Sequence, residues 1–114
     1  MKYITIQKCQ RGTVYKLSSR NLHYGVYDGD EGFIGIRQKF GDFFLFTEYH
    51  YDQGAPFGTA KPLKEVTQLP EGITIDSDFE LFTWLQQLET EQGLERSHQP
   101  RSMKEAMERR QREE

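Results

Sequence analysis

Two titratable side chains near the middle of the chain, Glu48 and His50, have the types and spacing needed for acid–base chemistry. Side chains two residues apart on a β-strand share one face, so a histidine–carboxylate contact is feasible there. Hydrolysis would also require a nucleophile held on a rigid turn, and the sequence contains no such motif. The sequence therefore favours a non-catalytic protein and leaves a cryptic hydrolase around Glu48 and His50 as an alternative.

An acidic cluster at 28–32, Asp-Gly-Asp-Glu-Gly, begins like a calcium-binding loop. Such a loop requires glycine at its sixth position and a bidentate glutamate at its twelfth. Phe33 and Lys39 occupy those positions here. The cluster is therefore expected to form an ordinary acidic turn, and no metal site is predicted.

The segment 54–61 contains two glycines, Thr59 and Lys61, as phosphate-binding loops do. The order differs from a P-loop, because Lys61 does not directly follow Gly58 and Pro62 comes after it. We expect a structured connection that packs Phe57 against a sheet, and no cofactor. A loop of this composition beside an aromatic face is also a place where a small ligand could bind.

The clearest predicted element is a β-hairpin formed by residues 33–40 and 43–51. The two-residue loop Gly41-Asp42, with glycine first, is typical of a type II′ turn. In that register Phe40 pairs with Phe43 on a face that also carries Ile34 and Ile36, and this face is expected to be core. The other face pairs Lys39 with Phe44, Arg37 with Phe46, Gly35 with Glu48 and Phe33 with His50.

This second face combines aromatic rings with cations, and three interpretations remain open. Both faces could be covered, so that the phenylalanines are core. The face could instead form a protein interface with a charged rim, or stack single-stranded nucleic acid or a small ligand. The net charge of −4 on residues 1–94 argues against nucleic acid. The predicted binding residues are Arg37, Lys39, Phe44, Phe46, Glu48, His50, Phe57 and Lys61.

Several further elements are expected to position these residues. Alternating apolar residues predict a first strand over 2–8, and further strands follow at 13–17 and 22–27. The segment 52–62 is expected to be a loop. One or two short edge strands are expected around Pro70-Glu71-Gly72.

A helix is predicted over 77–92. Ser77 and Glu80 have the spacing of a capping box. Apolar residues then follow at helical spacing, and Gly93 is placed to end the helix. The apolar stripe consists of Leu81, Trp84, Leu85 and Leu88, widened by Phe79 and Phe82.

Together these elements predict an α+β fold: a twisted antiparallel sheet of five or six strands, with the helix packed across it. A small, partly open barrel is the alternative form of the sheet. Residues 1–94 are expected to be one domain. Residues 95–114 contain six Lys/Arg, five Asp/Glu and no aromatic residue, which predicts a charged tail that is disordered or ordered by a partner.

The composition excludes several classes of protein. The chain has 114 residues with 35% hydrophobic residues, a mean hydropathy of −0.82 and a net charge of −3. No stretch approaches the roughly 20 apolar residues of a membrane-spanning helix. The polar start of the chain predicts no secretion signal, and Cys9 is the only cysteine, so no intrachain disulfide can form. A cytoplasmic protein is expected.

The stretch from Tyr27 to Leu63 resembles small accessory proteins of phages and mobile elements. The resemblance rests on Phe33-Ile34-Gly35-Ile36-Arg37, Phe40-Gly41-Asp42 and Leu45-Phe46-Thr47-Glu48-Tyr49-His50. It implies an accessory or inhibitory protein that contacts a host or cognate protein. A homodimer is a further expectation, and a ligand or single-stranded nucleic acid on the same face is the alternative.

Overall fold

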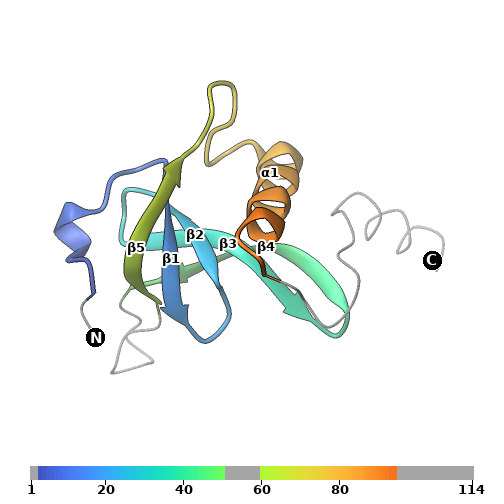
Figure 1. The fold of residues 1–114 in the computed structure, drawn as a ribbon, viewed down its shortest axis with the longest axis horizontal. Coiled ribbons are helices and arrows are strands. Elements are labelled where there is room, and N and C mark those ends of the chain that lie inside the picture. The colour runs from blue at the N-terminus through green and yellow to red at the C-terminus, as the bar shows by residue number, and fades with distance from the viewer. Residues whose placement is uncertain (1–2, 51–59, 95–114) are drawn as a thin grey trace.

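The computed structural model describes residues 3–50 and 60–94, which form a five-stranded antiparallel sheet and one α-helix (Figure 1). The strand order is β4-β3-β2-β1-β5, so four strands follow one another as neighbours and the fifth returns to pair with the first. This arrangement confirms the predicted α+β class. The elements are η1 (Ile6–Lys8), β1 (Thr13–Ser19), β2 (Tyr24–Tyr27), β3 (Gly32–Lys39), β4 (Asp42–Tyr49), β5 (Ala60–Gln68) and α1 (Asp78–Glu91).

One face of the sheet is covered by α1, which packs on β3 and β4 (Figure 1). The helix buries Leu81, Leu85 and Leu88 at the predicted spacing, with Phe82 beside them. Burying one such side chain contributes about 1.5–3 kcal/mol, so this contact is a main source of stability. The buried sheet residues of this first cluster are Val14, Tyr24, Val26, Ile36 and Phe43.

The opposite face of the sheet holds a second buried cluster around Phe33, which is fully buried. The Tyr15 ring meets Phe33 edge-on with 6.0 Å between centroids, and Tyr27 lies 5.2 Å away. Two register shifts in the β1–β5 pairing increase the local bend and twist of these strands. The other buried members are Ile6, Leu17, Leu22 and Ala60.

The N-terminal segment does not form the predicted strand, and residues 6–8 form the short 3-10 helix η1 instead. The N–H of Ile4 donates to the Pro62 carbonyl at 2.8 Å. Proline has no N–H to return a bond, so pairing with β5 does not extend along the segment. Ile6 is nevertheless buried in the second cluster. The alternation identified the right apolar residue but the wrong element.

The last strand also differs from the prediction. Residues 60–62 belong to β5 and not to a loop, and β5 continues to Gln68 as one strand in place of short strands around Pro70. Pro62 pairs with Leu17 next to a register shift, an irregular site where a strand tolerates proline.

The β3–β4 hairpin is confirmed, but its register and turn are not those predicted. Phe40 and Gly41 form the turn with φ of +52° and +82°, which is typical of a type I′ turn, and Lys39 pairs with Asp42. The pairing is displaced by two residues, so every side chain keeps its predicted face. Phe40 is the exception, because it leaves the core face and is 93% exposed in the turn.

The two ends of α1 differ in how well they were predicted. The capping box does not form, because the Ser77 hydroxyl accepts the N–H of Thr74 at 2.9 Å and makes no bond to the first helical turn. The C-terminal end is as predicted. Gly93 has φ of +81°, and the Leu94 N–H donates to the Glu89 carbonyl at 2.9 Å, which completes a Schellman motif.

Two predictions lie outside the described residues: the loop around Phe57 and the charged tail 95–114. Within the described part of the chain, no helix is long and apolar enough to cross a membrane.

Candidate functional site

The second face of the β3–β4 hairpin changes from buried to exposed along its length. At its inner end Phe33 and Glu48 are buried as a cross-strand pair. Toward the turn, Arg37 pairs with Phe44 and both are half-buried, and Lys39 is exposed. We call Arg37, Lys39, Phe44 and Phe46 the hairpin face, and Phe40-Gly41 the hairpin tip.

Cations lie over aromatic rings on the hairpin face and at the tip. The Arg37 guanidinium carbon is 4.7 Å from the centroid of Phe46, as predicted, although the two residues are diagonal neighbours in the observed register. The Lys39 ammonium lies 5.5 Å from the Phe40 ring and not over Phe44 as predicted. Each such contact contributes about 0.5–1 kcal/mol at an exposed site. The surface therefore carries both charge and apolar area.

Phe44 and Phe46 differ in how they relate to the core. Phe46 packs against the second cluster, whereas Phe44 belongs to neither cluster. The hairpin face is therefore not uniform: Phe46 is partly core, and Phe44 is a half-buried residue that packs against neither cluster.

Glu48 is a buried carboxylate at the inner end of the hairpin, with 5% of its surface exposed. The Ser19 hydroxyl donates to one of its oxygens, and the Asn21 side-chain amide donates to the other at 3.0 Å. Ser19 Oγ in turn accepts the N–H groups of Asn21 and Leu22 at 3.2 and 3.1 Å. This network fixes the β1–β2 turn against β4.

Burial raises the pKa of Glu48 above its ordinary value. The bonds from Asn21 and the positive charges of Arg37 and Arg20 oppose this shift without cancelling it. Because both oxygens are engaged in the network, the carboxylate acts as a structural acceptor.

His50 does not form the contact with Glu48 that the sequence allowed. Its Nδ1 lies 3.0 Å from the Ala60 carbonyl oxygen, and a carbonyl accepts only, so Nδ1 carries the proton. The contact joins the end of β4 to the start of β5. Each of the two proposed acid–base residues is thus engaged with a different structural partner.

The eight predicted site residues do not form one group. Arg37, Lys39, Phe44 and Phe46 share one face of the hairpin. Glu48 and His50 lie at its inner end, and Phe57 is outside the described residues. Lys61 lies on β5, where its ammonium is 5.1 Å from the Tyr3 ring.

The other groups with chemical potential have structural surroundings. Asp28 Oδ1 accepts the N–H groups of Asp30 and Gly32, as in the expected acidic turn. Burial raises the pKa of the Cys9 thiol, which reduces its thiolate fraction. Among residues 3–50 and 60–94, no group of three or more His, Cys, Asp or Glu is placed to hold a metal ion. An open cleft of about 450 Å³ between β1, β5 and the loop before α1 contains none of the predicted site residues.

Two features of this region were not predicted from the sequence. Phe40 was assigned to the core, although glycine second in Phe40-Gly41 is a signal for a type I′ turn. The role of Ser19 has no local signal, because its partner Glu48 is 29 residues away in the chain.

The chain matches no protein-family model, no curated protein and no solved structure.

Proposed function

We propose that this protein is a non-catalytic binding module that acts through protein–protein contact, with the hairpin face and hairpin tip as its contact surface. The observation that carries the proposal is the exposure of Phe40 beside Lys39, at the tip of the hairpin that also carries the half-buried Phe44. Aromatic and arginine side chains dominate the energetics of protein interfaces. A basic and aromatic surface on a hairpin therefore suits contact with another protein.

The resemblance of residues 27–63 to accessory proteins of phages and mobile elements supports an accessory or inhibitory role. The partner would then be a host or cognate protein. A non-catalytic role is supported by the engagement of Glu48 and His50 in contacts that join strands.

The alternative is a small ligand, nucleotide or single-stranded nucleic acid on the same surface. The contact of Arg37 with Phe46 favours it, because cations and rings together bind bases and phosphates. Binding of nucleic acid weakens steeply as the salt concentration rises. A flat salt response of the complex would exclude nucleic acid.

A capture experiment with a matched control tests the proposal. Tagged full-length protein, the double variant Arg37→Ala/Phe44→Ala and the control Phe79→Ala are each incubated with nuclease-treated lysate of the source organism or its host. Phe79 is also an exposed aromatic residue, but it lies on α1. We expect the wild type and the control to retain one stoichiometric protein that the double variant loses, with similar melting temperatures. Equal retention by all three would refute the proposal.

A second copy of the chain is the simplest alternative partner. Analytical ultracentrifugation over a range of concentrations measures this directly. Wild-type dimers that become monomers in the double variant would identify the partner as the chain itself.

A further inference from the structure

The residue at the hairpin tip is unusual for its backbone conformation. The first central position of a type I′ turn requires positive φ and is normally Asn, Asp or Gly. Here it is Phe40, with φ of +52° and 93% of its surface exposed. A bulky residue in this region is strained, and an exposed ring gains almost no burial in return. Folding alone therefore does not account for phenylalanine at this position.

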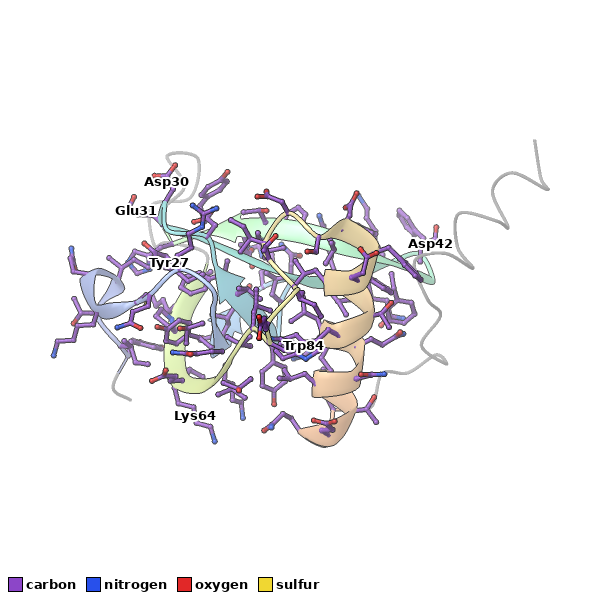
Figure 2. The ribbon with its side chains drawn as sticks, turned by 90° about the horizontal axis from the view of Figure 1, so that it is seen from above. Tyr27, Asp30, Glu31, Asp42, Lys64 and Trp84 are labelled. Carbon is purple, nitrogen blue, oxygen red and sulfur yellow. The ribbon has the colours of Figure 1, made fainter. Side chains whose placement is uncertain are left out.

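The tip projects from the body of the protein. The β3–β4 hairpin extends beyond α1 (Figure 1), and Figure 2 shows Asp42, next to the turn, at the opposite end of the molecule from Asp30 and Glu31. The two-residue turn defines the backbone position of Phe40 at this end. A backbone already in its bound conformation lowers the entropy lost on binding.

The charged side chains closest to the tip are two cations and one carboxylate, because Asp42 pairs with Lys39 across the turn. Lys39 lies over the Phe40 ring, and Arg37 follows on the same side of β3. The described chain between residues 66 and 94, including α1, contains six Asp/Glu and no Lys or Arg. This acidic helix packs on β3 and β4, so the positive charges of the hairpin lie beside an acidic element of the same protein. The net positive charge beside Phe40 complements acidic groups on a partner.

We propose that Phe40 is the anchor of the interface: its ring inserts into an apolar pocket of a protein partner, and Asp or Glu side chains at the rim of that pocket pair with Lys39 and Arg37. This inference rests on the proposed binding function and names the chemistry of its partner. One ring and two cations are a weak membrane anchor, because stable membrane attachment needs a longer apolar chain or a larger basic cluster. A protein pocket would bind the Phe40 ring more strongly than a membrane surface, because it removes the whole ring from water.

Site-specific photocrosslinking tests the anchor. Benzoylphenylalanine replaces Phe40, Phe44 or, as a control, Phe79 in the full chain, which is irradiated in cells of the source organism or its host and then treated with nuclease. We expect position 40 to give an adduct with one protein, mapped to a segment with apolar residues beside Asp or Glu, and position 79 to give none.

The other outcomes separate the anchor from the wider proposal. Protein adducts at position 44 with none at 40 would overturn the anchor and leave the binding function standing. No protein adduct at either position, or adducts only to lipid or nucleic acid, would overturn both. The same adducts at 40 and 79, or a mapped segment without acidic residues, would overturn the proposed pocket.

The affinity of Phe40→Asn for the crosslinked protein provides a second measurement. We expect it to fall at least about thirtyfold, the loss typical of an interface hot spot. Asparagine suits the turn, so this variant should fold at least as well as the wild type. An unchanged affinity would overturn the anchor.

Discussion

The Ser19 hydroxyl donates a hydrogen bond to the Glu48 carboxylate, although the two residues lie on β1 and β4, which β2 and β3 separate in the sheet. A flat sheet would hold these strands about 14 Å apart, given the usual spacing of neighbouring strands. The contact therefore requires the sheet to curl at this end. The bond from His50 to the Ala60 carbonyl acts in the same way between β4 and β5. The hairpin is thus held at its inner end and extends outward from it.

Replacement of Ser19 by alanine should destabilise the protein by about 2–3 kcal/mol. The change removes a hydrogen bond to a charged group and leaves the N–H groups of Asn21 and Leu22 without their acceptor. Chemical denaturation measures the difference. Ser18→Ala, at the exposed neighbouring position, should change stability by no more than about 0.5 kcal/mol. Equal effects of the two changes would contradict the structural role of Ser19.

The raised pKa of Glu48 predicts a pH dependence of stability. The folded protein binds a proton at Glu48 more readily than the unfolded chain does, so the associated stabilisation is lost as pH rises through the folded pKa. Lowering the pH from 7 toward 4.5 should therefore stabilise the wild type relative to Glu48→Gln. Urea denaturation at several pH values measures this difference. A difference in stability between the wild type and Glu48→Gln that stays constant over this pH range would refute the prediction.

Features set by local periodicity were predictable from the sequence. The buried face of α1 follows from Leu81, Leu85 and Leu88, because apolar residues at this spacing lie on one face of a helix and that face packs against the sheet. The two faces of the hairpin were also correct despite the wrong turn, because a displacement of two residues preserves the alternation.

Features that depend on a choice between alternative hydrogen bonds or alternative turns were not predictable from the sequence. Ser77 had the right spacing for a helix cap, but its hydroxyl accepts a hydrogen bond from the Thr74 N–H instead. Phe40 was assigned to the core because aromatic residues are usually buried, and only the choice between two adjacent turns places it in solvent. The site residues on the hairpin face share a surface as expected, whereas the partner of Glu48 depends on the curl of the whole sheet.

The three phenylalanines along the second face of the hairpin should differ in their contribution to stability. Phe33→Ala should cost about 3–5 kcal/mol, because this ring is fully buried. Phe46→Ala should have an intermediate effect, because the ring only borders the second cluster. Phe44→Ala should cost less than about 1 kcal/mol. Thermal and chemical denaturation of the three variants provide the test, and a loss at Phe44 equal to that at Phe33 would show that the hairpin face is covered.

Replacement of Phe40 by asparagine should stabilise the isolated protein by about 1 kcal/mol, while weakening its complex. The gain comes from relief of left-handed backbone strain, which asparagine tolerates better than phenylalanine does. Phe40→Ala is the matched control, because it removes the same ring but keeps a side chain that disfavours positive φ. Melting temperatures should therefore rank Phe40→Asn above both Phe40→Ala and the wild type. Equal stability of the asparagine and alanine variants would show that the backbone at position 40 is not strained. The strain argument for a functional role of Phe40 would then fail.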